Sequence, residues 1–295
     1  MMNITLISIF AGIGGMFGWG TSDFLASKFS EKIGHTRTLF YSQIAGLLLV
    51  AMLVFLRASH FTFTPLLLLL TIFSGIAYAL GYLMFYKAFE IGNVSVISSV
   101  VNVQNVFVIA VAFFFFHQRI SGIQIPALIL LLVGVTLVSI NFADVKKRII
   151  TLMIGVKECL LAAVLFGVFF WPFNQYVLLR ADFLTVNLIS KFVAIVTVFG
   201  VSLMTKKNLQ LPKSERSFKA LAPIVAVGIL EAIGVLSVSG GLSVGNAIII
   251  NPISSALTVV TVGLAMIFLK EKVSKTQGLG ILITVMGIFM MGLNG

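Results

Sequence analysis

Long apolar runs alternate with short polar connections along the whole chain. A helix needs about 20 mostly apolar residues to cross roughly 30 Å of hydrocarbon, because every backbone group must be hydrogen-bonded within the segment. Ten segments meet this requirement, and the pattern therefore predicts an all-α membrane protein with ten transmembrane helices. The predicted spans are Ile4 to Ser27, Thr36 to Leu56, Pro65 to Lys87, Val94 to Phe116, Gly122 to Asn141, Leu152 to Leu179, Phe183 to Thr205, Phe218 to Gly240, Asn246 to Leu269 and Thr276 to Leu293.

Composition supports the same interpretation. Hydrophobic residues make up 59% of the 295 residues and charged residues only 10%, against about 25% charged in an average soluble domain. An ordinary soluble protein is excluded, because its core could not hide so many apolar side chains. Connections such as residues 117–119 and 180–182 are very short, so neighbouring spans are expected to be antiparallel hairpins.

The excess of basic residues indicates an orientation. Lys and Arg number 20 against nine Asp and Glu, which gives a net charge of +11. When successive connections are assigned to alternate sides, sixteen basic residues fall on one side, Arg57, Arg119 and Arg180 on the other, and Lys191 within a span. The positive-inside rule predicts that the crowded side is cytoplasmic and that both termini are outside. The charge is thus a topology signal and does not indicate a nucleic-acid partner.

The two halves of the chain are similar at an offset of 153 residues. The offset pairs Gly92-Asn93 with Gly245-Asn246 and Gln124 with Gln277. Each half holds five spans, and because five is odd the second half must be inverted relative to the first, an arrangement common in transporters. We expect a first five-helix repeat over residues 1–143, a basic linker over 144–151 and a second five-helix repeat over 152–295.

Three stretches carry a resemblance to a known family: Phe85–Ser95, Gly241–Asn246 and Leu269–Ser274. In their order and duplication they resemble the drug/metabolite transporter superfamily, in particular its EamA-type members, over nearly the whole chain. Gln118 departs from the Glu that the family often has there, whereas Glu271 keeps it. The resemblance implies a secondary transporter of a small metabolite, in a bacterial cytoplasmic (inner) membrane. Several relatives have cytoplasmic termini, opposite to the orientation that the charge count predicts.

Polar residues inside the spans form two matching stripes. The stripe of the fourth span consists of Ser95, Ser98, Asn102 and Asn105, and that of the ninth of Asn251, Ser255 and Thr258. Their helical spacing predicts that both face a central cavity, where Asn102, Asn105, Asn251 and Ser255 would bind the substrate. The alternative is that these residues hold helices together. The proline of Asn251-Pro252 removes a backbone hydrogen bond and would leave carbonyls free to face the substrate.

Ionisable residues within the spans are few. Glu231 lies near the centre of the eighth span, where an acid is functional by default, and the offset places it opposite Tyr78. A carboxyl that alternates between protonated and ionised forms would couple transport to protons, whereas a fixed ion pair with Lys191 is the alternative. Asp23, in the first span, either assists coupling at the mouth of the cavity or meets Lys28 at the membrane interface.

Aromatic and amide side chains complete the predicted site. Tyr78 and Tyr82 share one face of the third span, and Trp171 and Asn174 flank a proline in the sixth, a combination suited to a small amphipathic solute. Lys191 is a further candidate for substrate binding. In the fifth and tenth spans, glycines indicate either helix packing or a homodimer; they are Gly134, Gly278, Gly280 and Gly287.

Enzyme chemistry finds no support. Residues 241–245 match the G-x-S-x-G pattern, but that nucleophile requires a strand-to-helix turn with His and acid partners, and here it joins two apolar helices. The three histidines share no metal-ligand spacing, and no nucleotide-binding loop is present. We expect no catalytic residue, metal or cofactor.

The sequence therefore predicts a secondary transporter that works by alternating access in the lipid bilayer, with a small-molecule substrate and protons as a candidate coupling ion. An amino-acid-like solute and efflux are favoured. A passive channel or facilitator, or an uptake carrier for a sugar or another metabolite, is the alternative.

Overall fold

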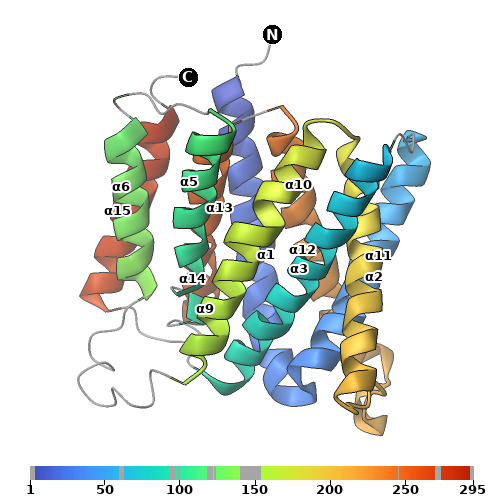
Figure 1. The fold of residues 1–295 in the computed structure, drawn as a ribbon. Helices are drawn as coiled ribbons and strands as arrows, with labels where there is room; N and C mark the ends of the chain where they lie inside the picture. The colour runs from blue at the N-terminus through green and yellow to red at the C-terminus, as the bar shows by residue number, and fades with distance from the viewer. Residues whose placement is uncertain are drawn as a thin grey trace.

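The computed structural model is all-α and is built from apolar helices that run side by side (Figure 1). It describes residues 4–59, 63–92, 97–98, 100–117, 122, 124–139, 154–244, 246–269 and 274–292. The predicted linker over 144–151, the loop that holds Gln118 and the loop that holds Glu271 lie outside these residues, as does Ser95.

Seven helical units among the described residues are long and apolar enough to cross a membrane. They are α1 (Ile4–Ile33), α2 (His35–Arg57), α3 (Pro65–Ile91), the continuous unit of α9 (Val156–Val164), η2 (Leu165–Phe170) and α10 (Trp171–Leu178), α11 (Phe183–Met204), α12 (Phe218–Leu242), and the pair α13 (Ala247–Ser255) and α14 (Leu257–Leu269). Three apolar units are shorter: η1 (Val101–Val103) with α5 (Gln104–Phe115), α6 (Gln124–Ser139) and α15 (Lys275–Gly292). Each of the ten predicted spans holds one unit, which confirms the predicted fold class.

The two halves run in opposite directions through the bundle. Helix α1 begins and α15 ends at the same end of the molecule, whereas α9, the first helix of the second half, begins at the opposite end (Figure 1). The halves also interleave: α1 packs against α12, and its counterpart in the second half, α9 with η2, packs against α3. Gly18 permits the first contact, because a Cβ there would lie 2.6 Å from the backbone nitrogen of Gly234.

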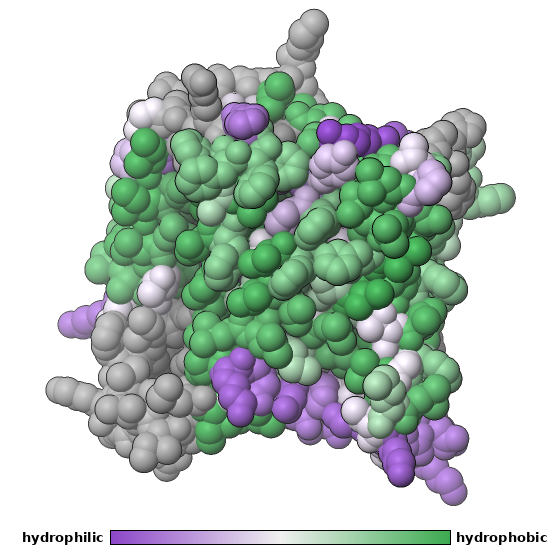
Figure 2. Space-filling model, in the orientation of Figure 1, coloured by the Kyte–Doolittle hydropathy of each residue, from purple (hydrophilic) through white to green (hydrophobic). Residues whose placement is uncertain are grey.

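The surface has the form expected of a protein in a bilayer. Large apolar side chains are exposed on many helices, for example Phe10, Phe55, Phe114 and Phe289. Figure 2 shows an apolar face bounded by polar residues at both ends of the helices.

Polar residues in the connections begin several helices. The side chains of Thr64, Asp182 and Ser217 accept hydrogen bonds from the backbone N–H groups at the starts of α3, α11 and α12. A cap of this kind satisfies a donor that has no partner within the helix. The Asn246 side chain does the same for α13.

The structure corrects the predicted course of two spans. The first helix does not end near Ser27 but continues to Ile33, so Asp23 lies well inside it rather than one turn from its end. The ninth span is not one helix, because the chain turns at Ala256 between α13 and α14. At the equivalent place in the first repeat, 153 residues earlier, the chain forms the 3-10 turn η1. Both repeats are therefore interrupted at the same point.

The glycines of the fifth and tenth spans act within one chain. Gly134, Gly280 and Gly287 bring α6 and α15 together, since a Cβ at any of them would lie within 3 Å of the other helix. Gly278 has no atom within 4 Å of such a Cβ. A homodimer through this face stays a prediction.

Candidate functional site

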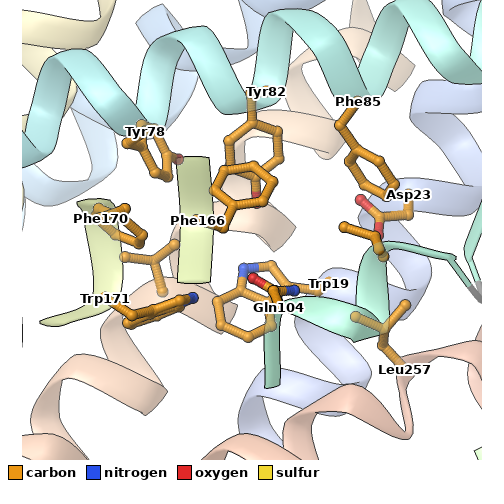
Figure 3. A pocket seen from close by; sticks show the side chains of 12 residues that line it. Trp19, Asp23, Tyr78, Tyr82, Phe85, Gln104, Phe166, Phe170, Trp171 and Leu257 are labelled. Carbon is orange, nitrogen blue, oxygen red and sulfur yellow. The ribbon is translucent and has the colours of Figure 1, made fainter. Parts of the chain in front are cut away.

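A pocket lies between the two repeats and is lined mainly by aromatic rings (Figure 3). The pocket has room for the centres of water-sized spheres over about 40 Å³, and its total empty space, open solvent at its mouth included, is about 440 Å³. Its lining is Trp19, Asp23, Tyr78, Tyr82, Phe85, Val101 and Gln104 from the first repeat, and Phe166, Phe170, Trp171, Val235 and Leu257 from the second. A change in how the repeats pack would therefore reshape this pocket directly.

The rings of the pocket contact one another, some edge to face and some tilted. Tyr78 and Phe170 have ring centroids 5.0 Å apart, and Tyr82 and Phe166 are 5.1 Å apart, so α3 and η2 together form one wall. Trp171 packs on Phe170 at 4.6 Å and reaches Trp19 of α1 at 5.8 Å. Such contacts favour a defined arrangement of rings over a loosely filled interior.

A local irregularity turns two of these rings into the pocket. Residues Leu165–Phe170 form a π-helix immediately before Pro172, whose nitrogen cannot donate a hydrogen bond to the preceding turn. The wider turn carries Phe166 and Phe170 toward α3. Gly81 of α3 makes room for Phe166, because a Cβ there would lie 2.6 Å from the Phe166 ring.

Asp23 is the charged residue of the pocket lining. Its side chain is 3% exposed, and Figure 3 shows its carboxylate among the rings, beside Phe85. Neither an ion pair nor a hydrogen bond joins it to any described residue, so the predicted alternative, a contact with Lys28, does not occur. The buried carboxylate of Glu231 adds electrostatic repulsion at Asp23.

Glu231 and Lys191 form an ion pair behind the wall of the pocket. Lys191 Nζ lies 2.5 Å from Glu231 Oε2, and the two side chains are 2% and 0% exposed. Tyr78 donates its hydroxyl hydrogen to Glu231 Oε1, and Gln43 bridges the pair: its Nε2 donates to Glu231 Oε2 at 3.4 Å and its Oε1 accepts from Lys191 at 3.2 Å. The ring of Tyr78 lines the pocket, so this residue connects the ion pair to the site.

The two polar stripes meet each other. Asn105 Nδ2 donates to Ser255 Oγ at 2.6 Å, and Asn102 Nδ2 lies 3.4 Å from Thr258 Oγ1. The 153-residue offset relates Asn102 to Ser255 and Asn105 to Thr258. The two pairs are therefore equivalent, and the pseudo-two-fold axis that relates the repeats passes between them. Neither stripe is part of the pocket lining.

Two backbone carbonyls near Pro252 accept hydrogen bonds from side chains. Asn251 O accepts the hydroxyl hydrogens of Ser254 and Ser255, at 2.9 and 2.7 Å, and Asn251 Nδ2 donates to Ala247 O. In α10, Asn174 is buried and lies outside the pocket lining, and its Nδ2 has no partner among the described residues.

Of the predicted site residues, the structure brings Asp23, Tyr78, Tyr82 and Trp171 together in the pocket. Sequence reasoning missed Gln43, Trp19 and Gln104, and it missed Phe166 and Phe170 of η2. A glutamine in the middle of an apolar span, and aromatic residues four apart at 166 and 170, are the signals that could have found three of them.

Comparisons with known proteins agree with this architecture. A solved structure described only as "Crystal structure of protein" matches with a TM-score of 0.74 and 14% identity, over 97% of this chain and 96% of that one. At this identity the likeness shows the fold alone. No characterised protein matches in sequence.

A family model, by contrast, matches each half of the chain separately. The EamA-like transporter family is found over residues 6–140 and again over 153–293. This double match covers most of the chain and confirms the predicted resemblance. The chain therefore belongs to the EamA-like transporter family within the drug/metabolite transporter superfamily, and it is a multi-pass secondary membrane transporter and not an enzyme.

Proposed function

We propose that the protein carries a small amphipathic solute through the aromatic pocket by alternating access. The observation that supports this most directly is that both inverted repeats line one pocket. Two similar halves can exchange their conformations, and a site between them then opens to each side of the membrane in turn. Proton coupling belongs to the same proposal, with the carboxyl groups of Asp23 and Glu231 as candidates.

The two candidate carboxyls differ in their surroundings. Glu231 is held by Lys191, Tyr78 and Gln43, which favours the fixed ion pair that the sequence left as an alternative. Asp23 lines the pocket and has no such partners. We therefore assign the exchange of protons to Asp23 first.

The function is tested in two steps with the purified full-length protein. Amino acids, sugars, nucleosides and quaternary amines are screened for thermal stabilisation, because a ligand that binds only the folded state raises its melting temperature. The compounds that stabilise are then measured for flux in proteoliposomes. A carrier predicts saturable uptake and counterflow, and a response to an imposed pH gradient that is lost in Asp23→Asn. Flux without saturation and counterflow would support the passive channel instead.

A further inference from the structure

We propose that the pocket selects an organic cation: a solute with an amine or quaternary ammonium group on an apolar or aromatic body, whose positive charge is balanced by Asp23. The inference rests on the proposed function and names the class of solute that the same pocket takes.

The charges buried inside the bundle do not balance at Asp23. Among the described residues, the buried side chains of the spans that can carry a charge at this depth are Asp23, Lys191 and Glu231, whereas His35 and Glu215 lie at the basic end of the molecule. Lys191 and Glu231 neutralise each other at 2.5 Å. The carboxylate of Asp23 is left without a counter-charge, which is costly away from water. One bound cation, or one proton, removes that cost.

The walls of the pocket are made of groups that attract a cation. Seven of the twelve lining residues are aromatic. The face of an aromatic ring attracts a cation within about 6 Å of its centroid, and tryptophan does so most strongly. Trp19 and Trp171 stand 5.8 Å apart, and the Tyr78, Tyr82 and Phe170 rings continue the wall. A desolvated ammonium group would thus meet ring faces on several sides and the carboxylate on one.

Other charge types fit less well. No Lys, Arg or His lines the pocket, and Lys191 Nζ is already engaged with Glu231 and Gln43. An anion would face Asp23 with no positive partner. A zwitterion such as an amino acid would be attracted to Asp23 through its ammonium group and repelled through its carboxylate. From charge alone, the pocket is expected to bind a cation most tightly, a zwitterion less tightly and an anion least.

Competition between the cation and a proton follows from the same geometry. The groups that act electrostatically on Asp23, or it on them, are Glu231 from α12 and Tyr82 and Tyr86 from α3. The pocket residues of η1, α5 and α14, which are Val101, Gln104 and Leu257, carry no titratable group. One carboxyl group holds either a proton or the cation. Binding of one releases the other, and an inward proton gradient would drive the cation outward.

The chain provides its own reporter for the test. It contains two tryptophans, and both line the pocket. Purified full-length protein in lipid nanodiscs is titrated with phenyltrimethylammonium, L-phenylalanine and phenylacetate, which share a phenyl ring and differ in charge. Binding is followed by tryptophan fluorescence and by calorimetry between pH 5 and pH 8. Phenyltrimethylammonium has no titratable group, so any effect of pH on its affinity reports on the protein.

We expect phenyltrimethylammonium to bind at least tenfold more tightly than either other probe at pH 8, and its apparent Kd to rise as the pH falls. Asp23→Asn should weaken this binding at least tenfold and abolish the pH dependence. Glu31→Gln removes an exposed charge from the same helix and should change neither the affinity for phenyltrimethylammonium nor its pH dependence. Trp171→Leu should weaken binding more than Trp171→Phe, which keeps an aromatic face.

The proposal is overturned if phenylacetate or L-phenylalanine binds as tightly as the cation, if no probe binds, or if Asp23→Asn retains pH-dependent cation binding. The comparison among the three probes uses the wild-type protein, so it decides the matter even if Asp23→Asn fails to fold. Counterflow of L-phenylalanine without binding of the cation would support the proposed carrier function and refute only the assignment of a cationic substrate.

Discussion

The ion pair of Lys191 and Glu231 makes a quantitative prediction about stability. Lys191→Met leaves the Glu231 carboxylate in the interior with only the hydrogen bonds from Tyr78 and Gln43. Removing one partner of a buried pair costs about 3–5 kcal/mol, because the remaining charge is uncompensated. At about 2 °C per kcal/mol for a chain of this size, the melting temperature should fall by about 6–10 °C.

Cys159 allows a direct assay. It is the single cysteine of the chain, and its thiol is buried against Ile97 O. A maleimide that fluoresces on reacting with a thiol therefore labels the protein only as it unfolds, and the temperature of labelling gives the melting temperature in detergent. The control is Arg57→Met, which breaks an ion pair with Asp182 in which the two side chains are 58% and 24% exposed. That pair should contribute at most about 1 kcal/mol, or about 2 °C.

A double variant separates the cost of an unpaired charge from the cost of losing the side chains. Replacing Lys191 with Met and Glu231 with Gln together removes both charges and keeps an acceptor for the Tyr78 hydroxyl, so stability should return to within about 4 °C of the wild type. A single Lys191→Met variant within 2 °C of the wild type would refute the reasoning, as would a double variant no more stable than the single one. The double variant also separates two roles for Glu231: a fixed ion pair predicts that the pH response of transport survives, and proton coupling at Glu231 predicts that it is lost.

Three further predictions concern orientation, the helix interruption and helix packing. A carboxy-terminal alkaline phosphatase fusion should be active and a carboxy-terminal green fluorescent protein fusion dark, since the basic side is predicted to be cytoplasmic; the reverse pattern would overturn the orientation. Asn105→Ala, which removes the 2.6 Å hydrogen bond to Ser255, should lower the melting temperature by about 1–3 °C, and Asn102→Ala, whose contact with Thr258 is 3.4 Å, should lower it less. Gly134→Leu should destabilise the protein by about 1–3 kcal/mol or more, because a Cβ there would lie 2.6 Å from Thr284 N, whereas Gly278→Leu, with nothing within 4 Å, is the matched control and should have little effect.

Much of the fold follows from the sequence because the bilayer imposes a length on every span. Ten apolar runs of that length, an offset of 153 residues and the odd number of spans per half were enough to predict ten helices in two inverted repeats. Interruptions within a helix leave a weaker trace. Ala256, Val101 and Val103 are apolar residues that give no sign of an interruption. Only Pro252 and the polar stripes, which include Asn102 of η1, indicate that the chain turns there.

Residue types that are rare in apolar spans were recognised from the sequence as part of the site, whereas common residue types were not. Glu231 and Lys191 stand out because a charge is exceptional in an apolar span, and the structure joins them. Gln43 bridges the pair, but it carries no charge and therefore does not stand out in the sequence. Phe166 and Phe170 belong to a chain with 27 phenylalanines, and which of these face a pocket depends on the π-helix before Pro172 and on Gly81 opposite, neither of which periodicity reveals.

The position of Asp23 suggests how a bound charge would act on the whole molecule. Helix α1 belongs to the first repeat but packs against α12, α13 and α14 of the second, so Asp23 lies in the interface on which alternating access depends. A ligand shifts a conformational equilibrium only as far as it binds one state better than the other. The free energy of neutralising one buried carboxylate depends strongly on how far it is from water. A change in packing that exposes Asp23 to water, or buries it further, would therefore change the affinity of its carboxylate for both the proton and the cation. By reciprocity, binding of each ligand would favour a different packing of the repeats.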